Sequence, residues 1–363
     1  MRKNTNIIPI ILSGGAGTRL WPMSTKERPK PFVTLPDGQT LIEKTYRRAA
    51  CIEGVEQVIT VANKQYGELC GQEFDKLNLG LNHTLILEPF GRDTAAAITL
   101  GALQAKKISG ENSILLVLPA DHLIEDLDNF IESVDVAINS AQQSLITTFG
   151  IKTRYPETGY GYIQAGSEIE PSLCSISRFT EKPNATVAEQ FHSHTDYYWN
   201  SGIFCFRTKE IFQEFEEHAP HIKELAEKTL ENSTESEYGI LINSELFEKV
   251  EKKSFDYAIM ENTKHAAVVK TQFDWKDMGS WYSFSDLMSE DKSKNREQTQ
   301  SPIFKKNIKG NIVFSSTPGK NIAMIGVSDL VVAETEFGLL IANKNEIQDV
   351  KEAAQFFEKP TSP

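Results

Sequence analysis

The chain has few cysteines and no long apolar run. The first shortage bears on disulfide bonds, and the second bears on membrane-spanning helices. Only four cysteines occur in 363 residues, and none stands in a Cys-x-x-Cys or zinc-like spacing: Cys51, Cys70, Cys174 and Cys205. This argues against a disulfide framework and favours reduced thiols in a cytoplasmic protein. No stretch approaches the roughly 20 apolar residues of a membrane span, so no membrane partner is expected.

Basic residues are also in the minority. Lysine and arginine number 38 against 50 acidic residues, which gives a net charge of -12. An acidic chain of this kind is not expected to bind nucleic acid through a general basic surface, and anionic substrates would need a local basic pocket. The length and the hydrophobic content of 40% suit one large α/β domain with a smaller one beside it.

A glycine-rich loop follows the first predicted strand, residues 7–12. Its residues are Gly14, Gly15, Ala16, Gly17, Thr18 and Arg19. Such a loop lets the backbone approach a ligand closely, so that N–H groups, a hydroxyl and a cation can converge on a phosphate. The loop lacks a Walker lysine, and Leu20 stands where a dinucleotide fingerprint has its third glycine, which disfavours generic ATPases and dehydrogenases. A simple turn without a ligand stays the alternative.

Two charged residues further along strengthen the phosphate interpretation. Lys30 lies between Pro29 and Pro31, which favour an extended backbone and constrain the direction of its side chain. The apolar run 114–118 predicts a buried strand that delivers Asp121 to the carboxyl edge of the sheet. One such carboxylate is the usual kind of Mg²⁺ ligand beside substrate phosphate, although it could equally cap a turn.

The glycine loop with Leu20, Trp21 and Pro22, followed by Pro29-Lys30-Pro31-Phe32, resembles the signature of the sugar-1-phosphate nucleotidylyltransferases, and closest that of the mannose-1-phosphate guanylyltransferases. Glu-Pro-Phe-Gly-Arg-Asp-Thr at 88–94, Pro-Ala-Asp-His at 119–122 and Trp-Asn-Ser-Gly at 199–202 extend the resemblance. It implies an α/β fold, with a Rossmann-like nucleotidylyltransferase domain on a mixed, mostly parallel sheet. A small β-rich C-terminal domain, like a short β-helix, is expected to follow.

The residues and the resemblance together give a set of expected roles. Arg19 and Lys30 are expected to be catalytic, and Asp121 and Asp277 to bind the metal, with Asp274 as the second choice to Asp277. Nucleotide contacts are expected from Gly14, Gly15, Gly17, Thr18, Glu88 and Gly91. The carboxylate of Glu88 suits guanine in particular, because it can accept from N1–H and the N2 amino group, which adenine lacks. Asp256 is interpreted as structural.

The sugar phosphate is expected to contact Gly161, Glu181, Lys182 and Asn200. Asn200 precedes a buried strand, whereas for Gly161, Glu181 and Lys182 the sequence alone allows a simpler interpretation. Gly161, in a loop between aromatic residues, favours a hairpin turn, and Glu181 with Lys182 could be a solvated charge pair. The resemblance assigns Glu181 to the sugar and Lys182 to its phosphate.

The segment 289–302 has no apolar residue and is predicted to be a linker. It separates a catalytic domain, 1–288, from a C-terminal domain, 303–363, with short strands near 311–314, 322–327, 330–333 and 339–342 and a last helix near 347–357. Some relatives add a phosphomannose isomerase domain. Few residues follow Ala342, so that domain is not expected here.

The expected reaction is the transfer of GMP from GTP to α-D-mannose 1-phosphate, forming GDP-mannose and pyrophosphate with Mg²⁺ or Mn²⁺. The expected location is the cytoplasm, and a homodimer is left open. Two alternatives remain: another sugar 1-phosphate or nucleotide, and a non-catalytic regulatory subunit that binds nucleotide sugars. Pro31 and Asp93 depart from the family pattern, which more often has Gln and Asn there.

Overall fold

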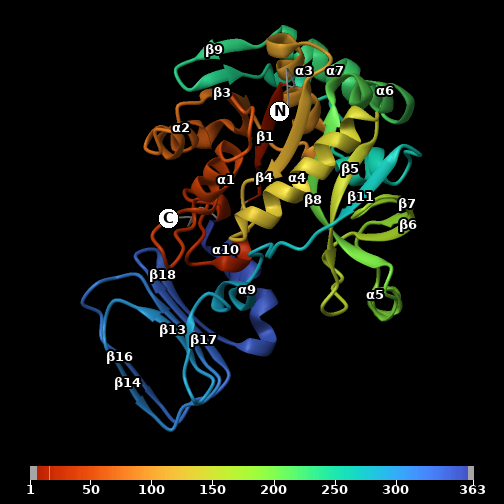
Figure 1. Ribbon diagram of the computed structural model, residues 1–363. Helices are drawn as coiled ribbons and strands as arrows, with labels where there is room; N and C mark the ends of the chain where they lie inside the picture. The colour runs from red at the N-terminus through yellow and green to blue at the C-terminus, as the bar shows by residue number, and fades with distance from the viewer. Residues whose placement is uncertain (1–5, 16, 359–363) are drawn as a thin grey trace. The chain divides into compact units, whose positions relative to one another are not determined.

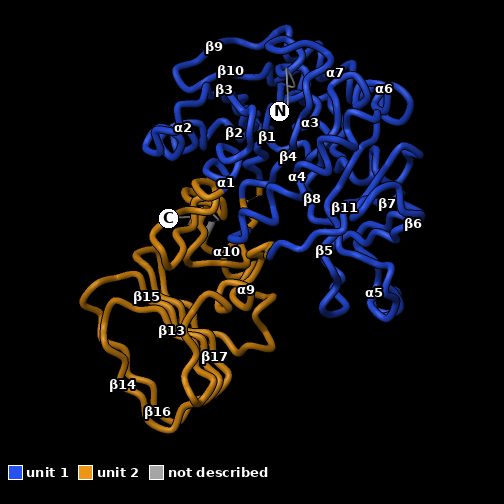
Figure 2. Tube along the Cα trace, in the orientation of Figure 1, with its two compact units in different colours: residues 1–14, 45–120, 124–275 blue, residues 15–44, 121–123, 276–363 orange. Residues whose placement is uncertain are grey.

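The structure is a computed structural model that describes residues 6–15 and 17–358. The chain divides into two compact units (Figure 2). Unit 1 comprises residues 1–14, 45–120 and 124–275, and unit 2 comprises 15–44, 121–123 and 276–363. The chain therefore passes between the units several times, and the glycine loop beyond Gly14 belongs to the unit that holds the C-terminal strands.

An 11-stranded mixed sheet forms the centre of unit 1 (Figure 1), in the order β5-β11-β7-β6-β8-β4-β1-β2-β3-β10-β9. This confirms the expected α/β class. The run β4-β1-β2-β3-β10 is parallel, whereas β8 pairs antiparallel with β4 and β6. The strands are β1 Ile7–Ser13, β2 Gln57–Asn63, β3 Asn82–Glu88, β4 Ile114–Pro119, β5 Ile146–Lys152, β6 Tyr162–Glu170, β7 Leu173–Thr180, β8 Tyr197–Arg207, β9 Thr234–Ser236, β10 Gly239–Leu241 and β11 Ala266–Lys270.

Several helices of unit 1 pack on the strands of this sheet, and others pack on those helices. They are α2 Gly67–Asp75, α3 Asp93–Ser109, α4 Leu127–Gln142, α5 Ala185–Ser193, α6 Thr208–His218, α7 Pro220–Glu231 and α8 Ser244–Phe247, while α1 Leu41–Ala50 begins in unit 2 and ends in unit 1. The alanine-rich α3 lies so close to β1 that a Cβ on Gly101 would be 2.7 Å from Ile10 Cγ2. The acidic stretch 209–231 forms two helices, because Pro220 starts a new helix at a position where its missing N–H costs nothing.

The hairpin favoured for the loop around Gly161 is wrong. The strands on either side of that loop are β5 and β6, and both pair with β8, while β5 also pairs with β11 and β6 with β7. The loop therefore connects separate positions in the sheet. Two glycines between aromatic residues signal a tight turn but do not determine which strands pair across it.

The C-terminal part of unit 2 is β-rich, as expected. Its strands are β12 Ser289–Glu290, β13 Arg296–Thr299, β14 Ile303–Lys306, β15 Ile312–Ser315, β16 Ile322–Ile325, β17 Leu330–Thr335 and β18 Gly338–Asn343. The chain alternates between two parallel stacks, β13-β15-β17 and β14-β16, before β18 turns back antiparallel. This alternation is a short β-helix-like coil, followed by the 3₁₀ helix η5 Lys344–Asp349 and helix α10 Val350–Glu358.

Buried asparagines join successive coils. Asn295 donates from its side chain to Asp291, and its Oδ1 accepts from the backbone N of Asn311 at 3.0 Å. The Asn311 Oδ1 in turn accepts from the backbone N of Leu330 at 3.0 Å. The ladder satisfies backbone N–H groups at the corners of the coil, where no strand partner is available.

Part of the predicted linker has regular structure. Residues 289–302 include β12 and β13, and β13 pairs with β15 although the segment has no apolar residue. The pairing uses backbone groups, which a search for apolar periodicity does not detect. The domain boundaries at 288, 302 and 303 stay a prediction.

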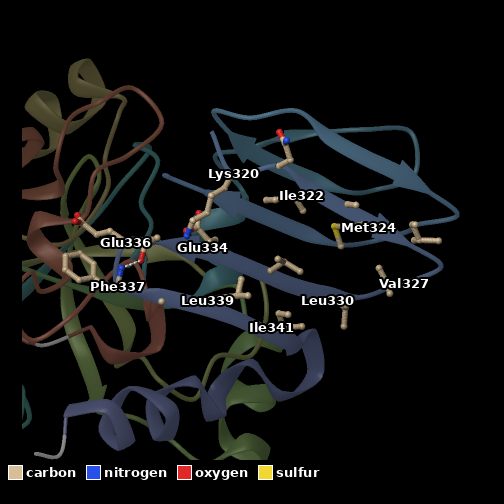
Figure 3. A pocket seen from close by; sticks show the side chains of 16 residues that line it. Lys320, Ile322, Met324, Val327, Leu330, Glu334, Glu336, Phe337, Leu339 and Ile341 are labelled. Carbon is tan, nitrogen blue, oxygen red and sulfur yellow. Dashed lines mark hydrogen bonds and ion pairs between the residues drawn. The ribbon is translucent and has the colours of Figure 1, made fainter. Parts of the chain in front are cut away.

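A pocket of about 860 Å³ lies on the C-terminal coil (Figure 3). Apolar side chains line it, among them Ile322, Met324, Leu330, Leu339 and Ile341. In the described part of the chain, none of the residues predicted for the site lines this pocket. Of the described helices, none combines the length and the apolar character that a membrane span needs.

Candidate functional site

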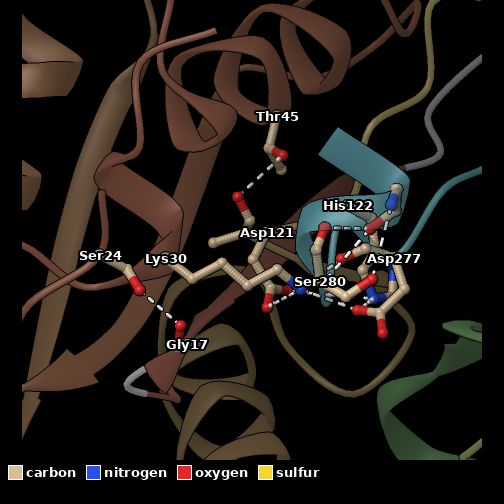
Figure 4. Close-up of polar contacts among 10 residues, drawn as sticks. Gly17, Ser24, Lys30, Thr45, Asp121, His122, Asp277 and Ser280 are labelled. Carbon is tan, nitrogen blue, oxygen red and sulfur yellow. Dashed lines mark hydrogen bonds and ion pairs between the residues drawn. The ribbon is translucent and has the colours of Figure 1, made fainter. Parts of the chain in front are cut away.

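Lys30 binds both carboxylates that the sequence proposes as metal ligands (Figure 4). Its Nζ lies 2.9 Å from Asp121 Oδ2 and 2.8 Å from Asp277 Oδ1, and it also donates to the backbone O of Asp277. His122 is adjacent, with its Nε2 3.6 Å from Asp277 Oδ1. These residues all belong to unit 2. A buried ammonium therefore lies between two carboxylates that are far apart in the sequence.

A backbone bridge explains why the two carboxylates meet. Leu123 N donates to Lys276 O at 2.9 Å, and Lys276 N donates to Leu123 O at 3.0 Å. Each residue of this bridge is close in sequence to one of the aspartates. Pairing the segment after β4 with the segment after β11 thus brings Asp121 and Asp277 onto the same cation.

The glycine loop is fitted to Lys30. A Cβ on Gly17 would lie only 2.3 Å from Lys30 Cβ, and Gly17 has a φ of 63°, which favours glycine. The hydroxyl of Ser24 donates to the Gly17 carbonyl and fixes the end of the loop. Lys30 itself opens the short 3₁₀ helix η2, Lys30–Phe32, in which Pro31 is buried. Close packing on Lys30, together with the backbone conformation, therefore accounts for the last glycine of the motif.

Arg19 lies close to the same cluster. It is in the 3₁₀ helix η1, Thr18–Leu20, and its Nη2 is 3.4 Å from the position that a Cβ on Gly279 would take. Its charge contributes to the low pKa of Asp277. The loop is open at its first two glycines, where an added Cβ would meet nothing within 4 Å, at Gly14 in unit 1 and Gly15 in unit 2. Ala16 lies outside the described residues.

The charges of this cluster are fixed at neutral pH. Burial alone would lower the pKa of Lys30, but the two aspartates outweigh it and raise the pKa above its ordinary value. Burial would raise the pKa of Asp277, but Lys30, His122 and Arg19 lower it to about 2. The Lys30 ammonium and the Asp277 carboxylate therefore stabilise each other's charged form.

The donors present are suitable for Mg²⁺ but do not enclose it. Among the described residues, no group of three or more His, Cys, Asp and Glu side chains is arranged to hold a metal. Mg²⁺ is commonly held by one or two carboxylates together with water and substrate phosphates. Asp121 and Asp277 supply two carboxylate oxygens that point at the same place, where they bind the Lys30 ammonium. The pair fits a metal that binds together with its substrate.

Asp274, the second choice to Asp277, has a structural partner. Its Oδ1 accepts from the backbone N of Glu125 at 2.9 Å and of Asp126 at 2.7 Å, just before α4. It also contributes to the environment of Arg48, a buried cation whose pKa burial lowers to about 10. These contacts favour Asp277 as the carboxylate available to a ligand.

The residues predicted for the sugar phosphate converge in unit 1. Lys182 Nζ lies 3.1 Å from Glu181 Oε1, just after β7. A Cβ on Gly161 would be 2.5 Å from Glu181 Oε2 and 3.3 Å from Asn200 Cβ. The backbone N of Asn200, on β8, donates to Gly161 O at 2.8 Å. All four residues therefore lie together, although their role stays a prediction.

Asp256 also belongs to this group, and the sequence analysis missed it. The Asn200 Nδ2 donates to Asp256 Oδ1 at 2.7 Å. The Asn200 Oδ1 is already used, because it accepts from Thr148 Oγ1 at 2.9 Å and from Gly202 N at 3.2 Å. Asp256 opens a π-helical turn, Asp256–Met260, a rare conformation that often marks functional sites. The only available signal was a carboxylate in an otherwise apolar helical start.

In this second group, the pKa values of two carboxyl groups are raised. Burial and, after it, the charge of Glu181 raise the pKa of Asp256 to about 7. Burial also raises the pKa of Glu181, against the opposing charge of Lys182. Asp256 is nevertheless partly accessible. The carboxyl groups of Glu181 and Asp256 can therefore accept hydrogen bonds, and a ligand that binds to them can change their ionisation.

Glu88 ends β3 as the sequence predicts, and it is buried. Its Oε1 has no hydrogen-bond partner within the described residues, and burial raises its pKa to about 8. Gly91, three residues later, has space around the position of a Cβ. Asp93 has a φ of 67° and accepts from the backbone N of Thr94 at its Oδ1. Burying a carboxyl oxygen without a hydrogen-bond partner costs free energy, so Glu88 Oε1 can accept a hydrogen bond from a ligand.

Comparisons with known proteins cover most of the chain. A family model described as nucleotidyl transferase matches residues 8–294, and one described as the MannoseP isomerase/GMP-like beta-helix domain matches residues 307–355. The Escherichia coli protein named mannose-1-phosphate guanylyltransferase is 36% identical over 364 residues, which cover 97% of this chain and 76% of that protein. The alginate biosynthesis protein AlgA of Pseudomonas aeruginosa is 37% identical over 347 residues, 95% of this chain and 71% of that protein.

A solved structure is similar over nearly the whole chain. It is described as mannose-1-phosphate geranyltransferase from Thermus thermophilus, and it is 31% identical with a TM-score of 0.85. The match covers 98% of this chain and 100% of that one. The large sheet and the β-helix-like coil thus recur together in one protein.

Proposed function

The chain belongs to the mannose-1-phosphate guanylyltransferase family of sugar nucleotidyltransferases, and we propose that it transfers GMP from GTP to α-D-mannose 1-phosphate, forming GDP-mannose and pyrophosphate. The observation that carries the proposal is the buried Lys30 between Asp121 and Asp277, because it combines a fixed cation with two oxygen ligands for a metal. A non-catalytic binding subunit would not need this arrangement.

The reaction exchanges one P–O bond for another. An oxygen of the sugar phosphate bonds to the α-phosphorus of GTP, and the bond from that phosphorus to the pyrophosphate oxygen breaks. No nucleophile from the protein is required. The chain has to position two polyanions and neutralise the charge that develops on the leaving pyrophosphate.

We assign the triphosphate and the leaving pyrophosphate to Arg19 and Lys30, assisted by the backbone N–H groups around Gly15, Gly17 and Thr18. Lys30 carries its charge at neutral pH because the aspartates raise its pKa. When a triphosphate binds, the ammonium can exchange one carboxylate for a phosphate oxygen. Asp121 and Asp277 would then hold Mg²⁺, or Mn²⁺, which supplies positive charge to the phosphates.

We assign the sugar phosphate to Lys182 and the sugar hydroxyls to Glu181 and Asp256. The Asn200 Oδ1 accepts two hydrogen bonds, and its Nδ2 donates to Asp256. We therefore assign Asn200 to orienting the Asp256 carboxylate and not to a direct sugar contact. Gly161 leaves room at Glu181, where a Cβ would collide with the carboxylate. Glu88 is assigned to the guanine edge, whose N–H donors match its unpaired oxygen, with Gly91 beside it along the chain.

The test is pyrophosphate release across a panel of nucleoside triphosphates and sugar 1-phosphates, with and without Mg²⁺. GTP with mannose 1-phosphate is expected to give the highest kcat/KM. Asp121→Asn and Asp277→Asn are expected to remove most of the metal-dependent rate. A higher kcat/KM with another pair would reassign the substrates, and no release with any pair would favour a regulatory binding subunit.

A further inference from the structure

The catalytic loop of unit 2 ends in an indole ring that the C-terminal coil holds from several sides. Trp21 follows η1 directly, and its ring stacks on Phe357 of α10 with centroids 5.1 Å apart and an interplanar angle of 13°. Gly338, at the start of β18, lies against the same ring. A Cβ there would be 2.7 Å from Trp21 Cζ2 and 2.9 Å from Cη2.

Hydrogen bonds hold the backbone beside the ring. The indole N–H of Trp281 donates to Trp21 O at 3.0 Å, and the Thr335 hydroxyl donates to Pro22 O at 3.1 Å. Leu20 is buried in the same apolar cluster as residues of β15, β17 and β18. The loop segment that includes Arg19 is thus packed as part of the C-terminal core.

The connection from Trp21 to Arg19 is short and rigid. Trp21 N donates to Thr18 O at 3.3 Å, and Leu20 N donates to Gly17 O at 2.9 Å, so one 3₁₀ turn joins the ring to Arg19. A shift of the Trp21 backbone must therefore move Arg19 or break this turn. The φ of Gly338 does not lie in the left-handed region, so the backbone conformation does not require glycine there. The position requires glycine because a side chain would collide with the Trp21 ring.

We propose that Trp21, Gly338 and Phe357 are positioning residues that set the location of the Arg19 guanidinium through the η1 turn. The C-terminal coil is then a structural part of the catalytic site rather than an appended domain. This rests on the proposed function, since it assumes that Arg19 acts on the triphosphate. Catalysis is sensitive to small displacements, and a shift of about 1 Å can cost a factor of about 100 in rate.

The first test is Gly338→Ala, measured as kcat and KM for GTP and for mannose 1-phosphate on folded enzyme. We expect kcat to fall at least about tenfold, with KM for mannose 1-phosphate nearly unchanged. Trp21→Phe in the same chain removes the two ring atoms that the new methyl meets, and it should restore part of the lost kcat. Gly71→Ala is the matched control, because its Cβ would meet only Leu85 Cδ1 at 4.0 Å.

A double-mutant cycle separates positioning from general stability. If Gly338 acts through Arg19, Gly338→Ala should cost little further kcat in an Arg19→Ala chain. Full additivity would overturn the proposal, as would a lowered Tm with unchanged kcat. If Gly338→Ala does not fold, Phe357→Ala serves instead, with Phe304→Ala, an equally exposed phenylalanine on β14, as control. A wild-type chain that releases no pyrophosphate would refute the proposed function itself.

Discussion

The two groups of charged residues differ in how firmly their charges are held. In unit 2, Lys30 neutralises Asp121 and Asp277, and the pKa of Asp277 is lowered to about 2. In unit 1, burial raises the pKa of Glu181 and that of Asp256, the latter to about 7. In unit 2 the Lys30 ammonium and the Asp277 carboxylate hold each other ionised, whereas in unit 1 Lys182 lies beside carboxyl groups whose pKa values burial raises.

This difference matches the two kinds of ligand in the proposed reaction. Phosphate oxygens and a divalent metal keep their charge throughout, so their partners need fixed charge. Sugar hydroxyls are neutral donors, and carboxylates can accept from them without a compensating cation. The comparison predicts that changes in unit 2 act mainly on kcat, and changes in unit 1 act mainly on KM for the sugar phosphate.

Lys30→Met should have the largest effect. It removes a cation from the triphosphate and takes away the ammonium that two partly buried carboxylates share, so kcat/KM should fall by about 10³-fold. The free energy of unfolding should fall as well, by about 3–5 kcal/mol. Steady-state kinetics and denaturant melts measure the two effects. Lys30→Arg keeps the positive charge, so it should lose less stability than Lys30→Met while its activity still falls. Equal activity of Lys30→Met and Lys30→Arg would contradict the assignment.

Arg19→Ala should lower kcat by about 10²-fold with little change in KM for GTP, because its interaction strengthens as charge develops on pyrophosphate. Single-turnover kinetics at saturating GTP isolate the chemical step. The comparison fails if this variant instead raises KM for mannose 1-phosphate and keeps kcat.

The sequence predicted much of this arrangement, because motifs at strand ends are local signals. Gly17 and Asp121 follow strands as the pattern places them, and Glu88 ends β3 as expected. The extended backbone expected at Lys30 is wrong, because Lys30 opens the 3₁₀ helix η2. Buried apolar runs also sufficed for the alternation of strands and helices and for the β-rich C-terminal part, whereas the mixed sheet was expected from the family resemblance.

What the sequence did not predict depends on contacts between distant segments. The hairpin at Gly161 failed because pairing with β8 overrides the local turn signal. The sequence predicts only a structural role for Asp256, because its contact with Asn200 spans 56 positions in the sequence. The polar segment with β13 gave no apolar pattern, since its pairing is made by the backbone.

Asp256→Asn should raise KM for mannose 1-phosphate by about 10–100-fold and leave KM for GTP unchanged, since a hydrogen bond to a charged group is worth about 1.5–3 kcal/mol. In the wild type, KM for mannose 1-phosphate should fall as pH rises through about 7, because the carboxylate becomes ionised there. The variant should lack this dependence. The same pH profile in both proteins would exclude Asp256 from sugar binding. Deoxy analogues of the sugar identify the hydroxyl concerned: the analogue that lacks it should bind both proteins equally.

Glu88→Gln should have the smallest effect on turnover with GTP, and it tests whether unit 1 also recognises the base. The ratio of kcat/KM for GTP to that for ATP should fall about tenfold, because one acceptor for the guanine N–H groups is lost. Full retention of the GTP preference would refute the assignment.

A second measurement on Glu88→Gln does not depend on catalysis. The pKa of Glu88 is raised by burial to about 8 from an ordinary 4.5, so between these values the folded state keeps a proton that the unfolded chain has lost. The free energy of unfolding should therefore fall as pH rises through this range, by up to about 1.4 kcal/mol per pH unit from this group. Denaturant melts at several pH values should show a shallower fall in Glu88→Gln than in the wild type. Bound GTP should reduce the wild-type slope only if guanine supplies the missing donors, which links the unpaired oxygen of Glu88 directly to the base.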